Sequence, residues 1–106
     1  MKIKVTKKQL NKEKKKIDKG LLNVWKKKGT LKWGSSCEIC DSMEYVQGHH
    51  FFPQKNYPQL KYDVDNYVPL CRSHHFQLER LKRFDIMYQI IIHRGLKWLK
   101  KLRTKL

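Results

Sequence analysis

Cysteine and histidine residues form two short pairs in the middle of the chain. Cys37 and Cys40 are separated by two residues, and Cys71 and His74 repeat that spacing after a gap of thirty residues. Two such pairs suit a tetrahedral zinc ion that joins two turns of a small domain. The alternative is a Cys37–Cys40 redox pair with Cys71 as a buried thiol, but no βαβ pattern surrounds these cysteines. We therefore predict structural Zn²⁺ bound by Cys37, Cys40, Cys71 and His74.

A second group of polar residues overlaps this region and is not needed for zinc. Its spacing is His-His-x15-Asn-x8-His-x3-Glu, and its members are His49, His50, Asn66, His75 and Glu79. A single histidine is most often an ordinary polar residue, which is our interpretation of His93. Several candidate residues at fixed offsets favour a site with chemistry of its own.

This pattern resembles the HNH (ββα-metal) endonuclease family. The match covers residues 37–79 and includes the paired strings C-E-I-C and C-R-S-H-H, which are typical of the zinc-ribbon members. The resemblance implies a small hairpin and helix that hold one divalent cation, Mg²⁺ or Mn²⁺, against a scissile phosphate. It also implies an enzyme that hydrolyses DNA phosphodiester bonds.

The resemblance assigns roles residue by residue. It implies that His50 is the general base, that His49 and His75 bind the cation, and that Asn66 orients His50. Hydrolysis needs these parts because water must lose a proton while a cation neutralises charge on the phosphate. Adjacent strand residues point to opposite sides, so we expect a turn or bulge within residues 48–53.

Two assignments stay open at this point. Glu79 lies one helical turn after His75 and could be a further cation ligand, or it could pair with Lys82 or Arg83. His74 stands where the family usually has a fourth cysteine, so His74 and His75 could exchange roles.

A narrower resemblance extends over nearly the whole chain. The strings H-H-F-F-P-Q-K-N-Y-P-Q-L-K-Y-D-V-D-N and H-R-G-L-K-W-L-K-K-L-R are similar to those of phage recombination nucleases of the NinG (Rap) type. This resemblance implies action on branched or recombining DNA in a phage-infected cell.

The formal charge of +16 is concentrated at the two ends of the chain. Residues 1–32 carry 13 lysines against two acids, whereas residues 33–79 carry three basic and six acidic residues. Clustered lysines favour contact with phosphates over reading of base edges, so we expect low sequence specificity. The predicted nucleic-acid-binding residues are Lys14, Lys15, Lys16, Lys26, Lys27, Lys28, Arg72, Lys97, Lys100 and Lys101.

Three tryptophans could stack on unpaired bases, but packing between helices is the more usual role and the one we predict. They are Trp25, Trp33 and Trp98. The expected partner is DNA, whether duplex, single-stranded or branched, and the charge pattern does not exclude RNA. The alternative function is a non-catalytic zinc-ribbon accessory protein that binds nucleic acid.

The elements that must position these residues follow from the periodicity. Thr6 and Gln9 form a capping box for a helix to about residue 28, and Gly29 to Ser36 is predicted to be a linker. Short strands are expected at residues 44–46 and 67–70. Ser73 is predicted to cap a helix that continues to Gly95, before a basic amphipathic helix over residues 96–106.

These elements predict an α+β fold with a zinc-stapled ββα-metal module between basic amphipathic helices. The predicted segments are a helical arm at 1–32, the nuclease module at 33–84 and a helical extension at 85–106. A homodimer through the Leu96 to Leu106 face is plausible, because paired cuts need two active sites. A membrane-surface role for this last helix is disfavoured, because two successive apolar stripes fit helix packing better. No apolar run is long enough for a membrane span and no signal-like segment is present, so we expect a cytoplasmic protein, in the host cell if it is phage-encoded.

Overall fold

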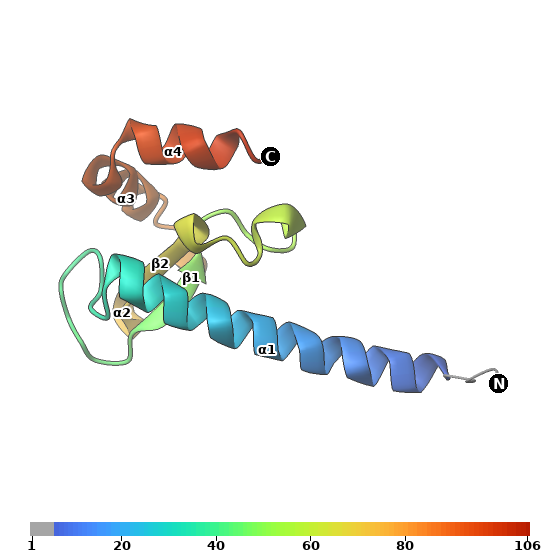
Figure 1. Ribbon diagram of the computed structural model, residues 1–106. Helices are drawn as coiled ribbons and strands as arrows, with labels where there is room; N and C mark the ends of the chain where they lie inside the picture. The colour runs from blue at the N-terminus through green and yellow to red at the C-terminus, as the bar shows by residue number, and fades with distance from the viewer. Residues whose placement is uncertain (1–5) are drawn as a thin grey trace.

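A long N-terminal helix, a two-stranded hairpin and three shorter helices make up the described chain (Figure 1). The computed structural model describes residues 6–106. The fold is α+β, as predicted. Its elements are α1 (Lys7–Trp33), β1 (Gln47–His50), η1 (Pro58–Leu60), η2 (Val64–Asn66), β2 (Tyr67–Leu70), α2 (Arg72–Glu79), α3 (Asp85–Arg94) and α4 (Leu96–Arg103). None of the helices within residues 6–106 combines the length and apolarity needed to cross a membrane.

Helix α1 starts as predicted and ends later than predicted. Thr6 and Gln9 form the capping box, with each side chain accepting from the other residue's backbone N–H. The helix continues through Gly29 to Trp33, so the predicted linker is wrong over its first half. Gly29 does not break the helix but lets it approach the hairpin, since a Cβ there would lie 2.2 Å from Cγ of Tyr67. Gly34, at φ 96°, ends the helix.

The hairpin is shorter than predicted on its first strand. β1 and β2 pair antiparallel in the register Gln47↔Leu70 to His50↔Tyr67, and β2 occupies the predicted residues. The predicted strand at 44–46 is wrong, because Tyr45 adopts a left-handed conformation at φ 51° that a strand cannot contain. The first strand therefore begins at Gln47.

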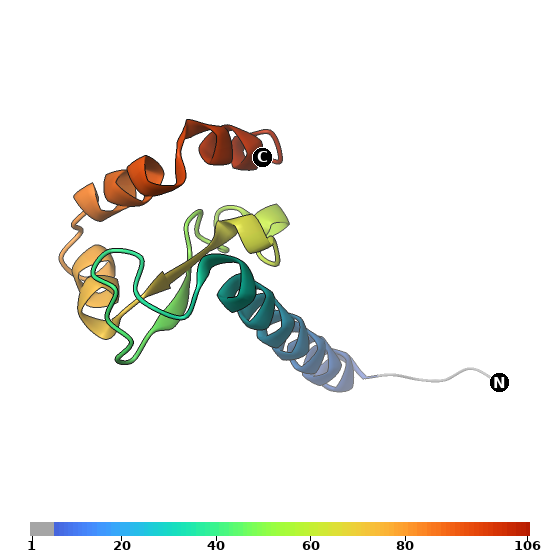
Figure 2. The same ribbon diagram turned by 60° about the vertical axis from the view of Figure 1, so that its left-hand side comes forward.

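The two faces of the hairpin are covered by different helices. Helix α1 packs on the face of Tyr67, which lies against Gly29 and contacts the Trp25 ring. The rings of His49 and His75 meet on the opposite face, towards α2. In Figure 2 the hairpin accordingly runs between α1 and α2. Each face of β1 therefore presents its histidine to a different helix.

The predicted single helix after the hairpin is two helices. Cys71, not Ser73, is the N-cap of α2, which ends after Glu79. Lys82 at φ 55° turns the chain before α3 begins at Asp85. Gly95 ends α3, as predicted, and α4 follows at once. The apolar periodicity continues through the turn at Lys82, which is why it suggested one element.

The buried core includes residues of the hairpin and of the last two helices together. Leu60, Val68 and Leu70 share this core with Ile90 and Leu102, all of which are fully buried. On the predicted dimer face, Trp98 and Leu102 are buried and Leu99 packs against the core. Leu96 and Leu106 stay exposed, so most of that face is used within the molecule.

The predicted packing role of the tryptophans agrees with their surroundings. Their indole N–H groups donate to three consecutive backbone carbonyls, with Trp25 on Asp63, Trp33 on Val64 and Trp98 on Asp65 at 2.7 to 2.8 Å. The short helix η2 is thereby fixed from α1 and from α4. This turn leads directly into Asn66 and β2, so the tryptophans position one side of the candidate site.

Candidate functional site

Cys37, Cys40, Cys71 and His74 lie together and could hold a metal such as zinc. Their ligand atoms all lie within 4.8 Å of one another. Cys37 Sγ is 3.6 Å from His74 Nδ1, and Cys40 Sγ is 3.8 Å from Cys71 Sγ. A tetrahedral ion about 2.3 Å from sulfur and about 2.0 Å from nitrogen separates its ligands by about 3.5 to 3.8 Å. The donor atoms therefore fit zinc in type and number, and these two separations are close to those around a bound ion, whereas Cys71 Sγ and His74 Nδ1 lie closer together, at 3.2 Å.

Backbone geometry brings the two ligand pairs together. The N–H of Glu38 donates to the carbonyl of Pro69, which ties the first pair to the end of β2. Cys71 follows that strand as the N-cap of α2, and His74 lies in the first turn of the helix. Burial raises the pKa of the Cys37 thiol, but backbone hydrogen bonds, the strongest from Cys71, outweigh it and lower the pKa. The thiolate that a metal needs is favoured at Cys37.

A buried ion pair ties α3 to the segment between Cys37 and Cys40. Arg94 donates to both carboxylate oxygens of Glu38, and their side chains are 1% and 3% exposed. The guanidinium also donates to the carbonyl of Tyr67 and lies 3.7 Å from the centre of the Trp33 ring. Planar guanidinium suits this combination of bidentate pairing and stacking. Sequence reasoning missed this ion pair, because the partners are 56 residues apart.

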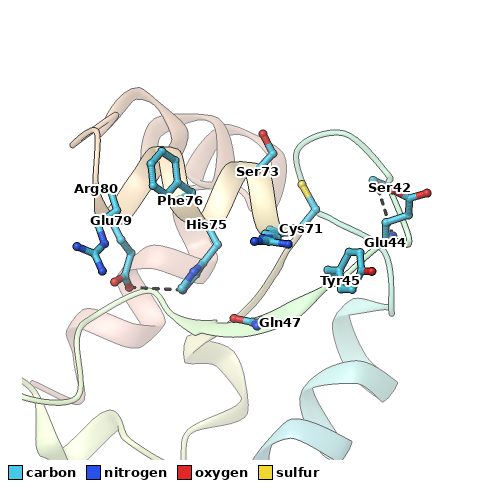
Figure 3. A pocket seen from close by; sticks show the side chains of 11 residues that line it. Ser42, Glu44, Tyr45, Gln47, Cys71, Ser73, His75, Phe76, Glu79 and Arg80 are labelled. Carbon is cyan, nitrogen blue, oxygen red and sulfur yellow. Dashed lines mark hydrogen bonds and ion pairs between the residues drawn. The ribbon is translucent and has the colours of Figure 1, made fainter.

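His49, His75 and Glu79 form a second group of potential metal ligands. Glu79 Oε1 lies 3.5 Å from His49 Nδ1 and 3.5 Å from His75 Nε2, and the ligand atoms of all three lie within 4.8 Å. Figure 3 shows His75 and Glu79 side by side on α2, one helical turn apart. The three residues thus offer two imidazole nitrogens and one carboxylate oxygen.

The geometry separates residues whose roles the sequence left open. His74 lies with the three cysteines, and His75 lies with His49 and Glu79. Arg83 pairs with Asp85 instead of Glu79. Glu79 faces the two histidines.

The environment of His49 favours the neutral imidazole, which is the form that can bind a cation. Burial, and then the nearby His75, lower its pKa to about 4, against the opposing effect of the Glu79 carboxylate. A histidine with this pKa carries no proton on its free ring nitrogen at neutral pH. Its lone pair is available to a metal without prior loss of a proton.

His50 lies on the other face of the hairpin, against α1. Its ring stacks on Trp25 with centroids 4.0 Å apart and an angle of 7° between the planes. The ladder continues without a bulge through His49↔Val68 and His50↔Tyr67, so the predicted turn between the two histidines is wrong. The regular pleat alone separates their surroundings.

One ring nitrogen of His50 is engaged, and the other is left with a lone pair. Nε2 lies 2.8 Å from the carbonyl oxygen of Lys61. A carbonyl only accepts, so Nε2–H is the donor, and in the neutral ring Nδ1 carries the lone pair. Burial lowers the pKa of His50, and the charges of Lys61 and Lys26 lower it further against the effect of the carbonyl bond. The arrangement favours a neutral imidazole that can accept a proton at Nδ1.

Asn66 is buried, and its side chain bonds the backbone near both partners of the His50–Lys61 hydrogen bond. Its Oδ1 accepts from the N–H of Phe52 at 2.7 Å, and its Nδ2 donates to the carbonyls of Phe52 and Leu60 at 3.0 and 3.2 Å. Phe52 lies two residues after His50, and Leu60 directly precedes Lys61. The Asn66 side chain therefore ties the chain just after His50 to the chain just before Lys61.

The predicted DNA-binding residues are exposed, and one of them is already paired within the molecule. Lys101 on α4 lies 3.2 Å from the Asp65 carboxylate, which also pairs with Lys32. The others lie on the surface of three helices: Lys14, Lys15, Lys16, Lys26, Lys27 and Lys28 on α1, Arg72 on α2, and Lys97 and Lys100 on α4. Residues 1–5 of the predicted arm lie outside the described chain.

Comparison of this chain with family models, with curated proteins and with solved structures found no match. Function is therefore inferred from the residues and from their geometry.

Proposed function

We propose that this protein is a metal-dependent endonuclease of the HNH type that hydrolyses DNA phosphodiester bonds. One observation carries the proposal. His50 bonds the Lys61 carbonyl through Nε2, which leaves the lone pair on Nδ1, and His50 directly follows His49 of the His49–His75–Glu79 group. A proton acceptor and a potential cation site thus lie on adjacent residues of one strand. The two histidines point to opposite faces of β1, so a phosphate that both groups reach would have to lie at the end of the strand, beyond His50.

The chain supplies the parts that this reaction needs. His50 accepts a proton from the attacking water at Nδ1, while Lys61 fixes its tautomer and Trp25 restricts its ring. A divalent cation held by His49, His75 and Glu79 would neutralise charge that develops on the phosphate and the leaving oxygen. Two imidazoles and one carboxylate suit Mn²⁺ better than Mg²⁺, which prefers oxygen ligands.

The exposed lysines of α1 and α4 support binding to the phosphate backbone without much base reading. Action on branched DNA in a phage-infected cell, a host-cytoplasmic location and a homodimer extend this proposal. A dimer would use only the exposed remainder of the predicted face, Leu96 and Leu106.

The test is incubation of purified, zinc-loaded protein with plasmid, hairpin and four-way-junction DNA, with and without Mn²⁺ or Mg²⁺. Omission of the added cation is the control, because a chelator would also remove zinc. Cation-dependent cleavage that is abolished in His50→Ala is the expected result. RNA of the same sequence is a further substrate for the same assay.

The second candidate is a non-catalytic zinc-ribbon protein that binds nucleic acid. The stacking of His50 on Trp25 favours it, since a histidine that only supports the fold would pack in the same way. DNA binding without cleavage of any of the three substrates, in either cation, would establish this function instead.

A further inference from the structure

A groove opens beside the His49–His75–Glu79 group, between α2 and the loop before β1. It has a volume of about 710 Å³ and is open to solvent. Figure 3 shows the side chains that line it. His75 and Glu79 line it at one end, so anything bound in the groove would lie next to the proposed scissile phosphate. The groove therefore adjoins the proposed cation site.

The α2 wall of the groove carries two arginines with a phenylalanine between them. Arg72, Phe76 and Arg80 are spaced four residues apart, so they lie along one helical face at intervals of about 6 Å. The Phe76 side chain is 53% exposed although it is apolar. Two guanidinium groups on either side of an exposed aromatic ring are suited to phosphates that flank a base.

The opposite wall carries a second exposed aromatic ring on strained backbone. Tyr45 is 73% exposed and has φ 51°, a conformation that bulky side chains rarely adopt. Strained backbone of this kind is concentrated at functional sites. The ring gains little from packing in return, so a ligand is the natural partner for it.

The charged residues that line the groove cancel one another, so a bound cation would decide its sign. Arg72 and Arg80 balance Glu44 and Glu79, the two acids that line it. A divalent cation at His49, His75 and Glu79 would make the groove positive by two charges. Anionic ligands would then be attracted to the end where cleavage is proposed.

We propose that this groove binds an unpaired nucleotide of the cleaved DNA strand, with its base on the Phe76 and Tyr45 rings and its phosphates on Arg72 and Arg80. The proposal rests on the proposed nuclease function and names its substrate class. A base within a duplex is stacked and paired, and its face is not accessible to a side chain. The preferred substrate therefore has unpaired nucleotides at the cut.

The test measures binding apart from cleavage. Fluorescence anisotropy is recorded with a labelled single-stranded oligonucleotide and with a duplex of the same sequence, using the full chain with His50→Ala and no added Mn²⁺ or Mg²⁺. In this His50→Ala background, Phe76→Ala should weaken single-strand binding about tenfold, as expected when one stacked base loses its aromatic partner. Duplex binding should be unchanged, and Phe76→Tyr should retain single-strand binding.

Tyr45→Ala should behave like Phe76→Ala, and Tyr88→Ala is the matched control. Tyr88 is 68% exposed on α3 and does not line the groove, so its removal should change neither affinity. Zinc content and thermal melting show whether each variant is folded. The proposal would be overturned if Phe76→Ala and Tyr45→Ala, both folded, weakened single-strand and duplex binding equally. It would also be overturned if neither variant weakened binding.

The two proposals fail differently. Cleavage by the wild type together with unaltered binding in both aromatic variants would remove the groove proposal alone. Aromatic-dependent binding of single strands without cleavage of any substrate would remove the nuclease and support a groove that binds unpaired bases.

Discussion

His49 and His50 are neighbours in the sequence but lie in different environments. His49 meets His75 and Glu79 on the α2 face of the hairpin, whereas His50 stacks on Trp25 of α1. The regular alternation of strand residues produces this difference without a bulge. Substitution of each histidine should therefore impair the proposed reaction for a different reason.

We expect His49→Ala and His50→Ala each to reduce cleavage by about 10²- to 10⁴-fold. His49→Ala removes a cation ligand, so raising the Mn²⁺ concentration should recover part of the rate. His50→Ala keeps the ligands but has no group to accept the proton, so Mn²⁺ should not restore it. Cleavage rates at increasing Mn²⁺ decide between these effects, and rescue of His50→Ala alone would reverse the two roles.

At the residue scale, residue types were more predictable from the sequence than contacts. The spacing grouped the four potential metal ligands as the structure does, because four cysteine and histidine residues carry a recognisable signal. The Lys61 carbonyl that binds His50 could not be found, since every residue has such a group. Nor could Glu38 and Arg94 be paired from the sequence, because the ion pair depends on how α3 packs.

Helix α1 shows how one glycine can mislead a sequence-based prediction. Gly29 favours a break in a lysine-rich helix, yet its lack of a side chain lets α1 lie against Tyr67. The same limit applies to Tyr45, whose β-prone residue type does not indicate its positive φ. Local propensity was overridden in both cases by the tertiary structure.

Gly29→Ala should destabilise the protein although alanine is the better helix former. Its Cβ would lie 2.2 Å from Tyr67 Cγ, and overpacking of this kind costs about 1 to 3 kcal/mol. Gly20→Ala is the matched control, because nothing lies within 4 Å of its Cβ on the same helix. That variant should be more stable by about 0.5 to 1 kcal/mol. Denaturant unfolding measures both, and equal effects would contradict close packing at Gly29.

The proposed metal centre joins elements that are distant in sequence, so removal of the metal should affect the whole molecule. Cys40 is exposed, and Cys40→Ser therefore tests the metal with little change in packing. Zinc binding of this kind contributes on the order of 10 kcal/mol to folding. We expect Cys40→Ser to lose zinc, measured by elemental analysis, and to melt at a lower temperature. Chelator-treated wild type should melt with the variant, and a difference between them would argue against a metal role for Cys40.

A cluster of opposite charges links α1 and α4 to the short helix η2. Burial raises the pKa of Asp65, but hydrogen bonds from Lys32 on α1 and Lys101 on α4 outweigh it, so the pKa lies below 3.8. A lowered carboxyl pKa stabilises the fold above the unfolded pKa, and this stability is lost as the pH falls through the folded pKa.

Asp65→Asn should therefore destabilise the protein at neutral pH and matter less in acid. The difference in the free energy of unfolding between wild type and variant should be constant above about pH 5 and shrink below pH 3.8. Taking this difference cancels the loss of zinc in acid, which affects both proteins. Urea unfolding across this range measures it, and a difference independent of pH would contradict the ion pairs.

The first third of α1 extends beyond the body of the protein and should act as a separate contact to DNA. Every residue from 6 to 17 is exposed, and Figure 1 shows the helix projecting towards its N-terminus. Changing Lys14, Lys15 and Lys16 together to glutamine removes three charges from this projection. Removing one lysine–phosphate interaction should lower the slope of log affinity against log salt by about 0.9.

We therefore expect the triple variant to bind DNA more weakly and with a slope reduced by about 2 to 3, measured by anisotropy across salt concentrations. Lys105→Gln is the control, because its ammonium group lies 2.6 Å from Asp63 within the molecule and should not be available to phosphates. An unchanged slope in the triple variant would show that the projecting helix does not contact DNA. A reduction of about 0.9 in Lys105→Gln, which is the same amount per charge removed, would show that the salt dependence reflects net charge and not the position of the lysines along α1.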